Sequence, residues 1–221
     1  MLSSVSCNIA YEIYLFWVFG LFWLFMPMIV KGYSLCTGPY GRFYRAKYNI
    51  YPFQIVMINK AFLSINNSSD FSATLEQQLV KTSLNNIHKL MLLAPYDPND
   101  YITLGINFST TEQIMNYFPI LEDKFRTNCF SMMPFNNTSV ILNGSFFNHS
   151  CDSNLCYIGL FGYIFFVANR FIKKGEELTI SYASFDSDTK YTERQAQLSK
   201  VWHFTCNCSK CQSEMIQNGT A

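Results

Sequence analysis

The order of apolar and polar positions divides the chain into three kinds of segment. The first is an uncharged run over residues 13–30, rich in Phe, Trp and Leu. Its length reaches the lower limit for a membrane-spanning helix. Basic residues begin at Lys31, which would place the C-terminal side of such a helix in the cytosol. A secretory signal peptide is disfavoured because no basic region precedes the run. Residues 1–60 therefore form an atypical apolar segment, and the run within them is either a membrane anchor, a buried segment or a gene-model artefact.

The second kind of segment has helical periodicity. Between Phe71 and Met91 the apolar side chains recur three to five positions apart, which predicts an amphipathic helix over residues 71–93, interrupted near Ser83. A further helix is predicted over residues 110–125, with a kink or an end at Pro119. Together these helices predict a helical insert over residues 70–126.

Short strands and turns dominate from residue 127 onward. The pattern predicts strands over residues 140–142 and 178–182, and a hairpin over residues 156–160 and 163–169. A helix predicted over residues 188–201 leads into a cysteine-rich C-terminus. We therefore expect an α+β protein, with a core of short strands in residues 127–185 and a C-terminal module in residues 186–221.

Composition narrows the class of protein. The chain has 221 residues, suited to one domain with an appendage, and 49% of them are apolar, so a core is easily buried. The net charge of +1 gives no electrostatic footprint for nucleic acid, and we expect no sequence-specific nucleic-acid binding. Three of the eight cysteines fall within six residues, which is metal-ligand spacing rather than a disulfide framework. That spacing favours a reducing compartment.

The cysteine cluster Cys206-x-Cys208-x-x-Cys211 supplies three thiolates, whereas tetrahedral zinc needs four ligands. Cys151 is the nearest candidate for the fourth, and Cys156 and His203 compete with it. A ligand from far along the chain would tie the C-terminal tail to the core and make zinc binding part of folding. The alternative is three free cysteines in a frayed tail.

Two further features gain meaning only together. Asn148-His149 offers amide and imidazole groups that can hydrogen-bond a polar ligand, although a lone His is more often structural. Tyr182 ends an apolar strand, where a tyrosine usually packs and hydrogen-bonds at the rim. Neither feature alone predicts a function.

Taken in order, the motifs resemble the C-terminal half of a SET domain with its post-SET zinc module, in the version of the SET-and-MYND (SMYD) family of lysine methyltransferases. An Asn128-Cys129-Phe130 segment lies upstream at about the right spacing. The motifs are Asn148-His149-Ser150-Cys151, Asn154, residues 174–182, Arg194-x3-Leu198 and Phe204-x-Cys206-x-Cys208-x2-Cys211. The implied fold is a SET β-clip of short strands with a pseudoknot, a helical insert and a post-SET module.

The resemblance implies a role for each matching residue. Tyr182 corresponds to the tyrosine at the methyl-transfer centre and also contacts the cofactor, while Phe130 and Trp202 correspond to the channel that admits the target lysine. The other S-adenosyl-L-methionine contacts correspond to Asn128, Asn148, His149 and Phe204. The implied structural zinc ligands are Cys151, Cys206, Cys208 and Cys211.

The implied reaction is displacement of the cofactor's sulfonium methyl group by a neutral lysine amine of a protein substrate, histone or non-histone. Two parts of the family pattern are missing: an N-terminal Gly-x-Gly segment, to which residues 37–42 are no convincing match, and the MYND zinc finger. The resemblance does not reach residues 1–60.

The leading hypothesis is a protein-lysine N-methyltransferase, its activity subject to the missing cofactor segment. The alternatives are a non-catalytic zinc-stabilised SET-like interaction module and an unrelated zinc or redox protein. Family members are nuclear and cytoplasmic, while residues 13–30 indicate membrane association if they are a true anchor.

Overall fold

The computed structural model describes residues 29–38, 41–67, 70–93, 111–134 and 136–217. The chain divides into two compact units. The first unit comprises Met1–Ile58, Phe146–Ile158 and Phe165–Ala221, and the second comprises Asn59–Ser145 and Gly159–Ile164. Each unit is described by itself.

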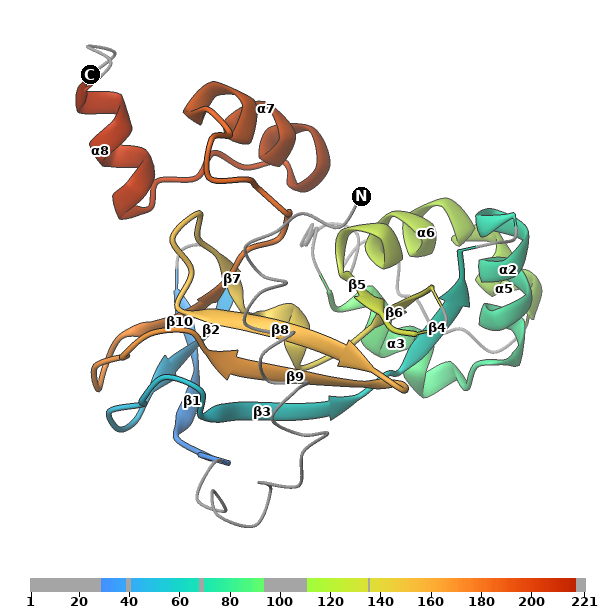
Figure 1. The fold of residues 1–221 in the computed structure, drawn as a ribbon. Helices are drawn as coiled ribbons and strands as arrows, with labels where there is room; N and C mark the ends of the chain where they lie inside the picture. Colours follow the sequence, from blue (N-terminus) through green and yellow to red (C-terminus); the bar gives the residue numbers. More distant parts are fainter. Residues whose placement is uncertain (1–28, 39–40, 68–69, 94–110, 135, 218–221) are drawn as a thin grey trace. The chain divides into compact units, whose positions relative to one another are not determined.

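The first unit is built on a four-stranded sheet in the order β1-β2-β10-β7. The strands β1 (Tyr33–Gly38) and β2 (Gly41–Ala46) are antiparallel, and β2 pairs antiparallel with β10 (Glu177–Ile180). The strand β10 pairs in parallel with the two-residue strand β7 (Asn148–His149). Two helices complete the unit, α7 (Tyr191–Trp202) and α8 (Ser209–Gln217) (Figure 1).

Aromatic side chains form much of the core of this unit. The ring of Phe147 is fully buried, and its centroid lies 4.8 Å from that of Tyr44 and 4.5 Å from that of Phe166. Because Phe147 immediately precedes β7, this packing anchors the chain just before Asn148. The residues that carry the candidate chemistry therefore start from a fixed backbone position.

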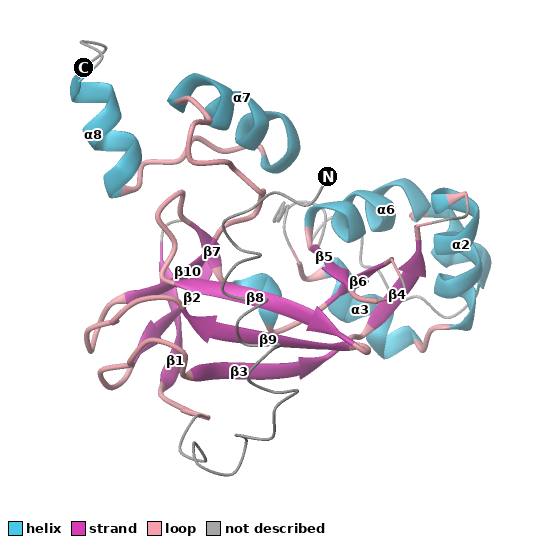
Figure 2. Cartoon of the chain, viewed as in Figure 1, coloured by secondary structure: helices cyan, strands magenta, loops and turns pink. Residues whose placement is uncertain are grey.

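The second unit has a three-stranded antiparallel sheet, β4 (Leu63–Asn66), β6 (Asn137–Val140) and β5 (Cys129–Met132), in that order. Its helices are α2 (Phe71–Lys81), α3 (Leu84–Met91), α5 (Thr111–Asn116) and α6 (Phe118–Thr127) (Figure 2). A 3₁₀ turn spans Gly144–Phe146. The strands β3 (Ile55–Lys60), β9 (Tyr163–Ala168) and β8 (Leu155–Leu160) form a third sheet and have residues in both units.

The helix predictions are confirmed. The periodic stretch 71–93 forms α2 and α3, and it breaks at Thr82 and Ser83, where Ser83 occupies the N-cap of α3. The stretch 110–125 forms α5 and α6, and the break precedes Pro119 because proline is tolerated only in the first turn of a helix.

The strand predictions are partly confirmed. The hairpin over residues 156–160 and 163–169 is β8 and β9 within one residue at its ends, and the predicted strand 178–182 is β10, one residue earlier at its start and two residues shorter at its end. The strand predicted over residues 140–142 is wrong in position, since β6 ends at Val140. Residues 33–66, for which we predicted no strands, form β1 to β4.

The uncharged run 13–30 lies outside the described residues except for Ile29 and Val30. Ile29 forms a parallel bridge with Ile55, and the Val30 N–H donates to the Ile55 carbonyl at 2.9 Å. Within the described part of the chain, no helix has the length and apolar character needed to cross a membrane.

Candidate active site and metal centre

The parallel pairing of β7 with β10 brings two distant motifs together. Asn148 lies beside Thr179, and His149 lies beside Ile180. The Ser150 N–H continues the ladder by donating to the Ile180 carbonyl at 3.0 Å. The Asn-His-Ser-Cys turn therefore runs alongside the strand that ends just before Tyr182.

His149 links that tyrosine to the cysteine cluster. Its Nδ1 accepts a hydrogen bond from the Tyr182 N–H at 3.0 Å, and its Nε2 lies 3.3 Å from the sulfur of Cys151. Burial lowers the pKa of His149 to about 4, so the ring is neutral near pH 7. A neutral ring that accepts at Nδ1 carries its hydrogen on Nε2, which then donates to the Cys151 sulfur.

The Tyr182 side chain is held at its far end as well. Its hydroxyl donates to the Phe147 carbonyl at 2.8 Å. Burial, with a smaller contribution from the Glu177 carboxylate, raises the pKa of Tyr182 above its usual range, so the phenol stays protonated. The hydroxyl uses its one hydrogen on Phe147, and its lone pairs remain able to accept a hydrogen bond.

Aromatic rings surround this tyrosine and histidine. The Tyr182 ring centroid lies 5.5 Å from that of Trp202 and 6.2 Å from that of Phe204. The His149 ring centroid lies 5.8 Å from Phe204 and 6.1 Å from Phe185. The structure thus brings four predicted site residues together and adds Phe185, whose sequence context carried no signal.

The asparagines near the turn have defined partners. The Asn148 amide donates to the Glu177 carboxylate at 2.8 Å. Asn154 is buried, donates to the Glu177 carbonyl at 2.7 Å and accepts from the Thr179 N–H at 2.9 Å. Its amide also reaches the Glu176 carboxylate at 3.0 Å. Asn154 therefore fastens the chain that follows the turn to the start of β10.

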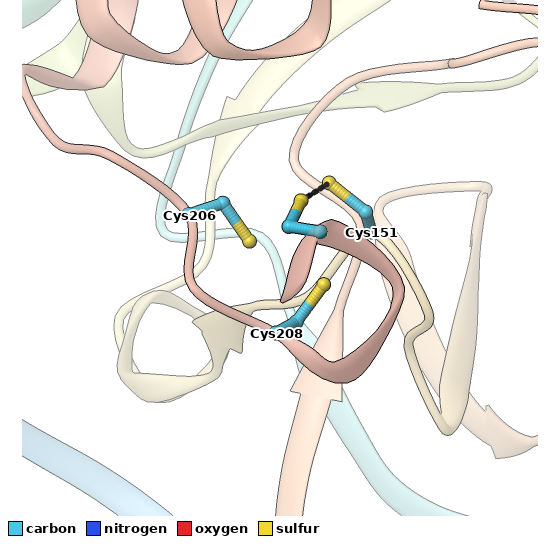
Figure 3. A group of neighbouring side chains, drawn as sticks. Cys151, Cys206 and Cys208 are labelled. Carbon is cyan, nitrogen blue, oxygen red and sulfur yellow. Dashed lines mark hydrogen bonds between the residues drawn. The ribbon is translucent and has the colours of Figure 1, made fainter. Parts of the chain in front are cut away.

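Four cysteine sulfurs converge on one point. Cys151 follows β7, Cys206 and Cys208 lie between α7 and α8, and Cys211 lies in the first turn of α8. Their sulfurs all lie within 4.8 Å of one another. Figure 3 shows the sulfurs of Cys151, Cys206 and Cys208 pointing toward one another. The sulfur of Cys211 lies 3.6 Å from that of Cys151.

This geometry fits a tetrahedral metal. Zinc–sulfur bonds of about 2.3 Å in a tetrahedron put neighbouring sulfurs about 3.8 Å apart. The group includes Cys151 and neither of the competing candidates for the fourth ligand. Cys156 instead donates to the Val167 carbonyl at 3.6 Å, and His203 is exposed at the end of α7. The predicted set of four thiols is therefore brought together.

The thiols influence one another's ionisation. Hydrogen bonds from Cys151 and Cys206 lower the pKa of Cys208 far below its usual range. Hydrogen bonding to Cys206 and Cys208 raises the pKa of Cys151, and burial raises that of Cys211 to about 11. One thiolate forms readily, and each further negative charge is opposed by the first. A divalent cation removes that opposition, which is the chemistry a zinc ligand set requires.

Two residues of α7 contact the cysteine cluster or the helix that follows it, and one of them, Gln195, was not singled out from the sequence. The Gln195 amide donates to the Cys211 sulfur at 3.3 Å and exchanges two hydrogen bonds with the backbone of Cys206. Arg194, part of the quoted Arg-x3-Leu motif, is 1% exposed and pairs with Glu214 of α8 at 2.9 Å. Gln195 thus joins α7 to the loop that carries Cys206, and Arg194 joins α7 to α8.

The remaining predicted site residues belong to the second unit. Asn128 is buried, and its amide donates to the Lys124 carbonyl at 2.8 Å at the end of α6. Phe130 is buried in β5. Their predicted roles, as cofactor contact and channel residue, stay predictions.

Comparison with known proteins gives the family. A model of the SET domain matches residues 41–183, more than half of the chain. A SET domain-containing protein of Acanthamoeba polyphaga mimivirus is 35% identical over 61% of this chain and 44% of its own length. The histone-lysine N-methyltransferase SET5 of Candida albicans is 33% identical over 48% of this chain and 24% of its own length. The chain thus spans less than half of either relative.

Other comparisons are more distant. Three relatives named for both a SET and a MYND domain match between 30% and 48% of this chain. The solved SET domain of LSMT bound to lysine and AdoHcy has a TM-score of 0.45 and 15% identity, and the match covers 84% of this chain and 56% of that one. The narrower SMYD assignment stays a prediction.

The family match corrects one expectation. The resemblance was expected to exclude residues 1–60, yet the matched region begins at residue 41 and includes β2 and β3. Neither strand contains any of the motifs on which the resemblance was based, so there was no reason to extend the resemblance to them. The fold prediction is confirmed, and the segment limits predicted from the sequence stay predictions. The chain belongs to the SET-domain family.

Proposed function

We propose that this chain is a protein-lysine N-methyltransferase that uses S-adenosyl-L-methionine and carries a structural zinc ion. One observation carries the proposal: Tyr182 is held at its backbone by His149 and at its hydroxyl by Phe147, within a group of aromatic rings. The name of the Candida albicans relative supports the same reaction class.

The residues around Tyr182 suit the cofactor chemically. The rings of Tyr182, Phe204 and His149 lie within 6.2 Å of one another, centroid to centroid, and offer faces for a flat base and for a cation. The cofactor, when bound, supplies a methyl group on a positively charged sulfur. Of the residues predicted to hold it, Asn148, His149, Tyr182 and Phe204 lie in the first unit, and Asn128 lies in the second.

The protein's own contribution is orientation and control of a proton. A lysine amine must be neutral to act as a nucleophile, and an aromatic, water-poor surrounding disfavours its charged form. The Tyr182 hydroxyl keeps its proton and has free lone pairs, so it can accept a hydrogen bond from the amine and align it. Trp202 is proposed to line the entry for the lysine of a histone or other protein.

Zinc is proposed to be structural, held by Cys151 and the three C-terminal cysteines. Two of these, Cys206 and Cys211, are buried beside Leu198, and Trp202 and Phe204 pack against the same cluster. A metal at this place therefore positions two of the aromatic residues near Tyr182 while it fixes the tail. The narrower assignment to the SMYD family is proposed on the motifs alone.

The test measures cofactor binding, zinc content and methyl transfer on the full chain. We expect calorimetry to show S-adenosylmethionine binding and Tyr182→Phe to reduce methyl transfer to lysine peptides or histones by at least about a hundredfold while zinc content is unchanged. Tyr163→Phe, at an exposed position of β9, is the matched control and keeps full activity. Cys208→Ser should lower zinc content and stability. A zinc-loaded protein that does not bind the cofactor would contradict the enzyme and support the non-catalytic module.

A further inference from the structure

Two segments of the first unit run antiparallel outside the four-stranded sheet. The Ile50 and Ile172 backbones exchange two hydrogen bonds, each of 2.9 Å. The Phe53 N–H donates to the Ala168 carbonyl at 2.8 Å, and the Lys174 N–H donates to the Asn49 side chain at 2.9 Å. Residues 49–54 and 168–174 therefore form one continuous ribbon.

The ribbon has one buried and one exposed face. Ile50 and Ile172 are fully buried. Large side chains on both segments remain in solvent, and the rings of Tyr51 and Phe171 pack together at 5.3 Å. Their exposed fractions are Tyr48 63%, Tyr51 58%, Phe53 52% and Phe171 39%. We name these four residues, with the exposed Lys173 and Lys174, the aromatic-basic strip.

Phe53 occupies a backbone position in a turn that favours glycine. The Gln54 N–H donates back to the Tyr51 carbonyl at 3.2 Å, which closes a turn with Pro52 at its second position. Phe53, at the third position, has a φ of 68°. Glycine is the usual residue there, and a bulky side chain at positive φ is strained. This strained residue carries a phenyl ring that is exposed to solvent, so the ring does not contribute to the packed core.

The charge of the strip is positive. Arg170 is neutralised by Glu176 at 2.8 Å. Within the described part of the chain, no acidic side chain forms a salt bridge with Lys173 or Lys174. Exposed rings beside uncompensated lysines are the composition of surfaces that bind at the boundary of an anionic bilayer, where the rings enter the headgroup region and the lysines meet phosphate.

The N-terminal run joins the protein at the edge of this strip. The Val30 N–H donates to the Ile55 carbonyl, two residues after Phe53, and the Lys47 N–H donates to the Gly32 carbonyl at 2.6 Å. The chain before this point is uncharged over residues 13–30. We propose that the aromatic-basic strip docks onto an anionic phospholipid bilayer. An uncharged run in the sequence, whose last two residues Ile29 and Val30 lie beside Ile55, favours a bilayer over nucleic acid as the partner.

The experiment measures partitioning of the full chain onto phosphatidylcholine vesicles with and without phosphatidylserine. We expect binding to increase with phosphatidylserine and to weaken with salt. Lys173→Glu/Lys174→Glu should lower the partition coefficient by more than about tenfold, since each lysine near an anionic surface contributes about fivefold. Phe53→Gly should lower it several-fold and leave the melting temperature unchanged or raised, because glycine suits the turn.

The matched control is Lys190→Glu/Lys200→Glu, which makes the same charge change at exposed positions of the C-terminal module. It should leave partitioning unchanged within about twofold. Equal partitioning of all variants would show that the strip makes no contact with lipid, even if the N-terminal run binds. Tighter binding to a short RNA or DNA duplex than to the vesicles, lost in the same variants, would assign the strip to nucleic acid and overturn the proposal.

Discussion

His149 is the residue at which the proposed metal centre and the proposed catalytic tyrosine can be separated experimentally. Its Nδ1 accepts from the Tyr182 N–H, and its Nε2 contacts the Cys151 sulfur. An asparagine places its amide group near the position of Nδ1, and a glutamine places its amide group near the position of Nε2. His149→Asn should therefore keep the tyrosine contact, and His149→Gln should keep the sulfur contact.

The magnitudes follow from the bonds that each variant loses. His149→Gln leaves the Tyr182 N–H without its acceptor, which costs about 1–3 kcal/mol in the free energy of unfolding. It should also lower kcat for methyl transfer by about a hundredfold, since the tyrosine is misplaced. His149→Asn removes a hydrogen bond to the sulfur of Cys151, a proposed zinc ligand, and loss of such a contact weakens metal affinity by about 10–100-fold.

Zinc affinity is measured by competition with a chromogenic chelator, and kcat by transfer of labelled methyl groups. The control is His203→Asn, since His203 is exposed and has a φ of 58°, which asparagine adopts readily. It should change neither quantity. If His149→Asn and His149→Gln lose zinc affinity and kcat in the same proportion, the two nitrogens do not have separate roles and the reasoning fails.

Three further predictions concern the frame of the site. Asn154→Ala leaves the Thr179 N–H unpaired, and we expect urea unfolding to show a loss of about 1–3 kcal/mol. A Cβ on Gly159 would lie 2.4 Å from the Ser131 carbonyl oxygen, so Gly159→Ala should lower the melting temperature, with a cost of about 1–3 kcal/mol in unfolding free energy, whereas no change would show that the strand shifts freely. Burial acts to raise the pKa of Glu176, but hydrogen bonds, first from Asn154, outweigh it, and the pKa is lowered. Its stabilisation is complete above the unfolded value of 4.5 and is lost as pH falls below it, so Glu176→Gln should flatten the acid limb of a stability–pH profile.

The sequence predicted the elements whose side chains repeat with a clear period. Leu75, Leu79, Ile87 and Leu90 are fully buried, and their spacing defined α2 and α3. The cysteine set was predictable because three ligands lie close in sequence and the resemblance supplied the fourth. Spacing alone left Cys151, Cys156 and His203 in competition, since a ligand from a distant turn leaves no local pattern.

Other parts of the fold and of the candidate site could not be predicted, because their local sequence carries too little information about structure. The strand β7 has only two residues, so no alternation exists to detect, and its partner β10 lies 29 residues downstream in sequence. Gln195 has an ordinary position on a polar helix, and its contacts to Cys206 and Cys211 appear only when the tail folds back. Such contacts follow from long-range pairing, which periodicity cannot reveal.

The shared histidine makes the metal centre and the tyrosine parts of one hydrogen-bonded unit. Cys151 receives the Nε2 hydrogen, and the same neutral ring accepts from Tyr182, so moving the sulfur moves the ring and the tyrosine backbone. Residues in one network are coupled, and their substitutions are not additive. The double variant His149→Gln/Cys208→Ser should therefore lose less activity than the product of the two single losses. Strict additivity would mean that zinc stabilises the tail without acting on the position of Tyr182.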